Sequence, residues 1–67
     1  MVLHRSSPQR YRLRFRSLFD PGRGYCFPCD AAGQVDLDAL SERARANYLF
    51  ARGMMGRELH TPVIEPA

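Results

Sequence analysis

The fold depends most on one stretch, RYRLRFRSLF at residues 10–19, in which apolar side chains alternate with arginines. Alternation with a period of two predicts a β-strand that buries one face and exposes the other. The apolar residues Tyr11, Leu13 and Phe15 then face the core. The arginines share the opposite, solvent-facing side: Arg10, Arg12, Arg14 and Arg16.

Turn residues separate this strand from two further short strands. The Asp-Pro-Gly-Arg stretch at 20–23 has proline and glycine where a type II turn requires them, and a strand over 25–29 follows. The Asp-Ala-Ala-Gly stretch at 30–33 indicates a tight hairpin connection. It leads into a third strand over 34–37. We therefore expect an antiparallel β-meander.

Pro28 conflicts with a meander in simple sequence order. Proline lacks the backbone N–H that a central strand needs, so it is disfavoured there. Three explanations stay open: the strand ends near Phe27, it bulges at that point, or the strands do not pair in the order of the sequence.

A single helix follows the strands, because apolar residues recur there at steps of three and four. Its core-facing stripe comprises Leu40, Ala44, Tyr48, Ala51 and Met55. Asp36 or Asp38 is expected to cap its start, and Gly53 or Gly56 to end it. The fold class that follows is α+β: a small antiparallel β-meander or hairpin of about three strands, with one α-helix packed on one face.

The chain of 67 residues has room for one domain. We expect a flexible N-terminal arm over 1–9, a single α+β domain over 10–57, and an extended C-terminal tail over 58–67. Within this tail, residues 62–64 could add to a sheet edge. A domain this small buries roughly 60% of its unfolded surface, so it gains from a partner chain.

Charge and hydropathy indicate a soluble cytoplasmic protein. No apolar run reaches the length of a membrane span or resembles a secretory signal, so no membrane partner is expected.

Residues 1–24 carry six Arg against one acid, a balance of +5, and residues 25–67 carry four Arg against six acids, a balance of −2. The basic half suggests a polyanionic or acidic partner.

Cys26 and Cys29 form the most conspicuous motif, but we interpret them as packing residues. A zinc site needs four ligands, and the two histidines, His4 and His60, are far apart in the sequence. A thioredoxin-type pair sits at a helix N-terminus, whereas a turn follows this one. Residues three apart on a strand also face opposite sides. No metal or other cofactor is expected.

The alternating arginines support one functional hypothesis, nucleic-acid binding. Side chains two apart on a strand repeat every ~6.8 Å, so Arg10, Arg12, Arg14 and Arg16 form a row roughly 20 Å long. Such a row could follow a phosphate backbone, with Tyr11 or Tyr25 nearby for base stacking. The alternative is a solvated strand face whose charges discourage aggregation.

The helix supports the leading hypothesis, a protein-interaction module. Phe50, Leu49 and Met54 lie outside the core-facing stripe, and apolar clusters of this kind mark contact surfaces. We expect a homodimer or a subunit of a larger complex. Enzymatic activity is not expected, because neither a nucleophile elbow nor a phosphate-binding glycine loop is present. No small-molecule substrate is evident either.

Part of the chain resembles a known group of sequences. The residues that carry the resemblance are FPCD at 27–30, VDLDALS at 35–41, NYL at 47–49 and AR at 51–52. They are similar to short uncharacterised proteins of proteobacteria. The resemblance implies a bacterial origin, and it assigns no activity and no functional residue.

Overall fold

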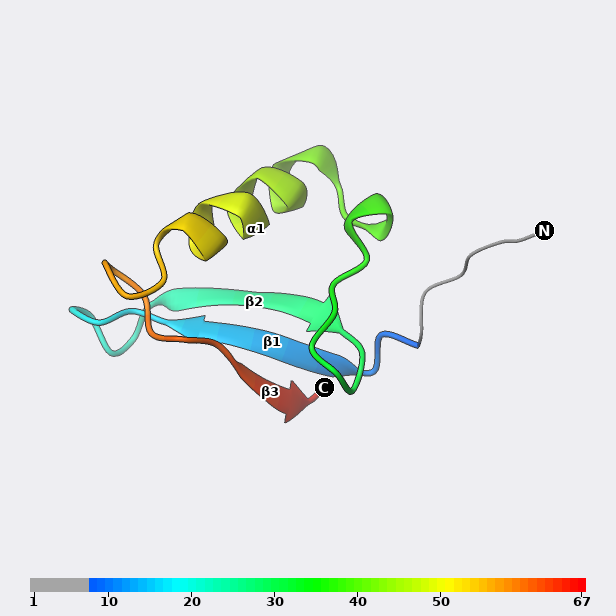
Figure 1. Cartoon of the computed structure of the whole chain (residues 1–67), viewed down its shortest axis with the longest axis horizontal. Helices are drawn as coiled ribbons and strands as arrows, with labels where there is room; N and C mark the ends of the chain where they lie inside the picture. The colour runs from blue at the N-terminus through cyan, green and yellow to red at the C-terminus, as the bar shows by residue number, and fades with distance from the viewer. Residues whose placement is uncertain (1–7) are drawn as a thin grey trace.

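The computed structural model describes residues 8–67, and most of the predicted N-terminal arm lies outside them. The elements are β1 (Tyr11–Arg16), β2 (Gly24–Cys29), the 3-10 helix η1 (Leu37–Ala39), α1 (Glu42–Gly53) and β3 (Val63–Pro66). The strands form an antiparallel sheet in the order β2-β1-β3, and α1 covers one of its faces (Figure 1). The predicted α+β fold is therefore confirmed.

The third strand is not the one that the sequence predicts. Residues 34–36 form an irregular segment, and Leu37 begins η1. The strand comes from β3 instead, within the segment predicted as a tail, and its pairing with β1 confirms that residues 63 and 64 add to a sheet edge. β1 is therefore the central strand and β2 an edge strand. This order explains Pro28, because an edge strand tolerates a missing donor.

Helix capping also differs from the prediction. The Asp36 side chain accepts a hydrogen bond from the Asp38 backbone N–H at 3.1 Å, but it caps η1 and not α1. The N-cap of α1 is Ser41, whose hydroxyl accepts from the Ala44 N–H at 3.1 Å. Two short caps in succession let the chain turn from the sheet into the helix.

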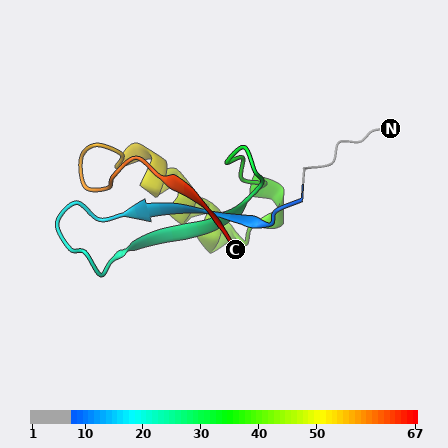
Figure 2. The ribbon, with the colours of Figure 1, turned by 90° about the horizontal axis from the view of Figure 1, so that it is seen from below.

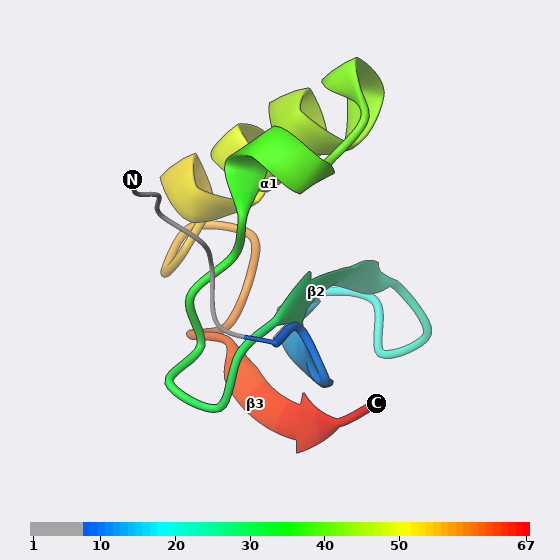
Figure 3. The ribbon, with the colours of Figure 1, turned by 90° about the vertical axis from the view of Figure 1, so that its right-hand side faces the viewer.

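The core lies between α1 and the apolar face of the sheet. Phe15 is fully buried, and its ring meets those of Phe27 and Tyr48 edge-to-face, with centroids 5.9 and 6.4 Å away. The buried apolar residues are Leu13, Phe15, Phe27, Cys29, Tyr48, Ala51 and Leu59. β2 lies closest to α1 and β3 farthest from it (Figure 3). The helix therefore covers the sheet unevenly.

After α1 the chain folds back along the end of β1. The backbone N–H of Leu18 donates to the Glu58 carbonyl at 2.9 Å, and the N–H of His60 donates to the Arg16 carbonyl at 2.8 Å. The β1–β2 loop and the segment after α1 thus lie at the same end of the sheet (Figure 2). These two hydrogen bonds bring residues 58–62 beside β1, the strand that carries the arginines.

Candidate interaction surfaces

The sheet face opposite α1 carries the arginine row. Arg12, Arg14 and Arg16 are exposed and alternate with the buried residues of β1, so they belong to the other face of the strand. Within the described residues, no helix covers that face of the sheet (Figure 1). Arg10 precedes the strand and is also exposed. We call the set of Arg12, Arg14 and Arg16 the arginine face. The structure thus brings together the arginines that the alternation predicts for one face.

One carboxylate neutralises part of the arginine face. Glu65 of β3 lies opposite Arg12 in the sheet, and its Oε1 is 3.4 Å from Arg12 Nη2 and 3.5 Å from Arg14 Nη1. All three side chains remain substantially exposed, so water screens these pairs. Within the part of the chain that the structure describes, Arg16 makes no ion pair. The uncompensated positive charge is therefore greatest at the Arg16 end.

A second surface is aromatic and lies on the helix side of the sheet. Phe50 is 47% exposed, and its ring stands edge-on to that of Tyr25, with centroids 6.0 Å apart. Phe19, in the β1–β2 loop, is 75% exposed. All three line one open hollow of about 540 Å³. We call Phe19, Tyr25 and Phe50 the aromatic surface.

The other two helix residues expected to contact a partner lie elsewhere. Leu49 is 58% exposed, but it projects about 100° around the helix from Phe50 and does not line the hollow. Met54 forms the C-cap of α1 and packs, half-buried, against the core. The aromatic surface therefore includes Phe50 but neither of these residues.

Phe19 was missed by sequence reasoning. It continues the alternation of residues 10–19 and was expected in a strand that buries its odd-numbered side chains. β1 ends at Arg16, however, because the Ser17 hydroxyl accepts from the N–H groups of Phe19 and Asp20 at 3.1 and 3.0 Å and bends the chain. In the sequence, the end of the strand is indicated only by Ser17 and Asp20, two residue types that favour turns.

The two cysteines face opposite sides of the sheet, as their spacing predicts. Cys26 is exposed and Cys29 is fully buried. Burial raises the pKa of the Cys29 thiol above its ordinary value, and the negative charge of Asp30 raises it further. The two thiols of one strand therefore cannot act as a pair. In the described residues, no three His, Cys, Asp or Glu side chains are grouped as a metal site would need.

No helix within residues 8–67 is long and apolar enough to cross a bilayer. Comparisons with protein-family models, with curated proteins and with solved structures give no match to this chain. The resemblance to proteobacterial sequences therefore stays a prediction, and the case for function depends on the two surfaces.

Proposed function

We propose that the protein is a non-enzymatic interaction module that binds a second copy of itself through the aromatic surface. One observation carries the proposal: Phe50 and Phe19 are both exposed, by 47% and 75%, and line the same hollow. Exposed aromatic groups that converge on a concavity are typical anchors of protein interfaces. An isolated exposed ring needs no explanation, but two around one hollow do.

The small core supports the same proposal. Among the described residues, the buried apolar set has seven members, and a domain of this size gains stability when an interface adds buried area. Phe19 and Phe50 are the largest apolar side chains outside that core. Burying them in a symmetric contact would add two aromatic anchors from each copy.

The test is the concentration dependence of molar mass, measured by analytical ultracentrifugation. We expect the wild type to dimerise and Phe50→Asp to be monomeric with an unchanged far-ultraviolet circular dichroism spectrum. Phe19→Asp, at a loop position, should have the same effect. Leu49→Asp is the matched control, because it charges an exposed apolar position of the same helix that does not line the hollow. A wild type that stays monomeric at millimolar concentration would refute self-association.

Nucleic-acid binding is a second candidate, favoured by the arginine face. Its three guanidinium groups lie on a sheet face without a covering helix, and Glu65 offsets one of the charges. Affinity for labelled single-stranded or duplex oligonucleotides should fall about tenfold or more between ~50 and ~200 mM salt. Replacing Arg12, Arg14 and Arg16 together with Gln should abolish it. Binding that survives this change would rule out this function.

A further inference from the structure

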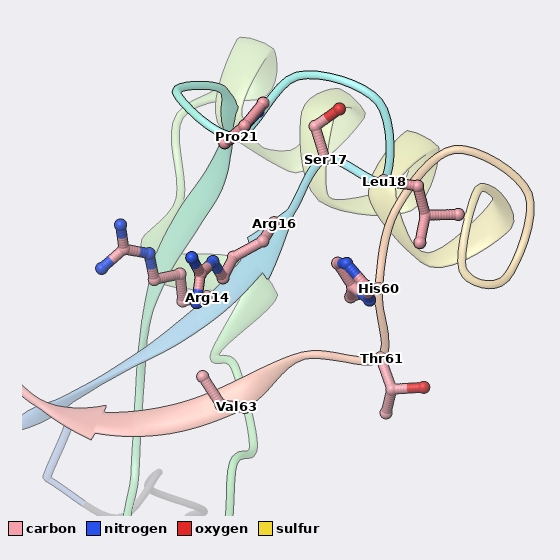
Figure 4. Close-up of a pocket in the computed structure, with 8 residues that line it drawn as sticks. All are labelled: Arg14, Arg16, Ser17, Leu18, Pro21, His60, Thr61 and Val63. Carbon is pink, nitrogen blue, oxygen red and sulfur yellow. The ribbon is translucent and has the colours of Figure 1, made fainter.

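A hollow at the Arg16 end of the open sheet face has the character of an anion site. It is open to solvent and has a volume of about 460 Å³. The residues that line it are Arg14, Arg16, Ser17, Leu18, Pro21, His60, Thr61 and Val63 (Figure 4). Among the described residues, this lining contains three basic side chains and no acidic one.

The backbone brings these groups together from distant parts of the chain. Arg14 and Arg16 are two positions apart on β1, so both side chains extend to the same side of the sheet, as Figure 4 shows. His60 comes from the segment that follows α1, and its backbone N–H donates to the Arg16 carbonyl at 2.8 Å. Ser17 pairs with Leu59 in an isolated bridge next to it. Main-chain contacts thus hold the backbone of His60 beside that of Arg16.

The charge of the hollow is only partly compensated. Arg14 shares the Glu65 carboxylate with Arg12, and Glu65 is not among the lining residues. Arg16 makes no ion pair within residues 8–67. Arg16, which has no carboxylate partner among residues 8–67, therefore lines the hollow together with Arg14 and His60, and no carboxylate of that range lines it.

We infer that this hollow binds a phosphate dianion, such as the phosphate of a phosphomonoester. Guanidinium groups present paired N–H donors that match phosphate oxygens, and such charge-assisted hydrogen bonds are about twice as strong as neutral ones. The two positive charges of Arg14 and Arg16 match the two negative charges of a phosphate dianion. A carboxylate or a phosphodiester carries only one negative charge and is matched less well. Leu18, Pro21 and Val63 add apolar wall on which the rest of an ester could lie.

The inference is independent of the aromatic surface, which lies on the helix side of the sheet. It also differs from the nucleic-acid hypothesis, because the arginine row in that hypothesis contacts a chain of phosphodiesters. A site for a phosphomonoester should prefer a dianion such as inorganic phosphate. A surface that binds a chain of phosphodiesters should show no such preference over a monoanionic diester.

The test is a titration of the ¹⁵N-labelled protein with inorganic phosphate at constant ionic strength, followed by amide chemical shifts. Saturable shifts are expected at Arg16, Ser17, His60 and Thr61. Arg16→Gln should weaken the affinity about tenfold, the loss of one charge-assisted contact. Arg43→Gln, which removes an exposed arginine from α1, should leave the affinity unchanged.

Two outcomes would overturn the inference. Shifts that sodium chloride reproduces, or that Arg16→Gln and Arg43→Gln reduce alike, would indicate general screening. Dimethyl phosphate, a monoanionic diester, should bind at least tenfold more weakly than phosphate; equal or tighter binding would exclude a dianion site. His60→Gln provides a second variant, with a smaller expected loss, that leaves β1 unaltered.

Discussion

The two faces of the sheet differ although the same strands build both. On the face covered by α1, Phe15 is fully buried among aromatic rings with edge-to-face contacts. On the open face, its neighbours Arg14 and Arg16 are exposed, and the ion pairs of Arg14 and Arg12 with Glu65 are exposed as well. We therefore expect the covered face to supply most of the stability of the fold and the open face to supply little.

The largest expected effect is that of Phe15→Ala. Removing a fully buried aromatic ring should lower the free energy of unfolding by about 3–5 kcal/mol. This loss is comparable to the whole stability of a domain this small. Arg16→Ala, on the next position of the open face, should change it by less than ~0.5 kcal/mol. Urea titration followed by circular dichroism measures both, and similar losses would disprove the division between the faces.

The two cysteines should differ in reactivity, because Cys26 lies on the open face of the sheet and Cys29 on the covered face. At neutral pH, Cys26 should react with iodoacetamide at least about a hundredfold faster than Cys29, because the buried thiol is inaccessible and its pKa is raised. Mass spectrometry of peptides taken over time measures the two rates. Equal rates in the folded protein would mean that the covered face opens readily.

The raised pKa of Cys29 also makes stability depend on pH. The folded chain keeps a thiol proton that the unfolded chain releases above the ordinary pKa of the thiol, 9.0. Stability should therefore fall as the pH rises through and above that value. Cys29→Ala should remove this part of the slope, whereas Cys26→Ala should leave it intact.

Gly33 and Gly56 allow a test of how tightly the loop after β2 packs against β3. Gly33 has φ +84°, and a Cβ there would lie 3.0 Å from Ile64 Cδ1, whereas Gly56 has φ +80° with open space around it. Replacing either glycine with alanine should lower the free energy of unfolding by about 1–2 kcal/mol, because alanine is strained in the left-handed backbone conformation. Gly33→Ala should lose more, because its loop packs on β3. Equal melting temperatures for the two variants would contradict that packing.

A small effect is also expected of Glu65→Gln on the open face. Its two exposed ion pairs should contribute at most about 1 kcal/mol, and the loss should shrink at high salt. The same change should raise any affinity of the arginine face for anions. A loss of stability above ~2 kcal/mol, measured by thermal unfolding, would show that the open face contributes to the fold more than surface ion pairs do.

The sequence predicts β1, β2 and α1 because each has a local period that matches its environment. The third strand could not be predicted in this way. Residues 34–37 alternate as a strand would, yet Asp36 caps a 3-10 turn there. β3 has only four residues, and it is fixed by pairing with β1, which local patterns do not record.

The same limit applies to the surfaces. The arginine face follows directly from alternation, so its residues were predicted. The hollow that joins Arg16 to His60 depends on the segment that follows α1, and the aromatic surface depends on where β1 stops. Both features arise from contacts between segments far apart in the sequence.

The position of β3 also has a kinetic consequence. It joins the central strand through residues as far apart as Arg12 and Glu65, 53 positions along the chain, so that contact requires closure of a long loop and is expected late in folding. Until then, one edge of β1 is unpaired and can template strand addition by other chains. Like charges on the arginines of β1 repel such partners, so refolding should become more prone to aggregation as salt screens that repulsion.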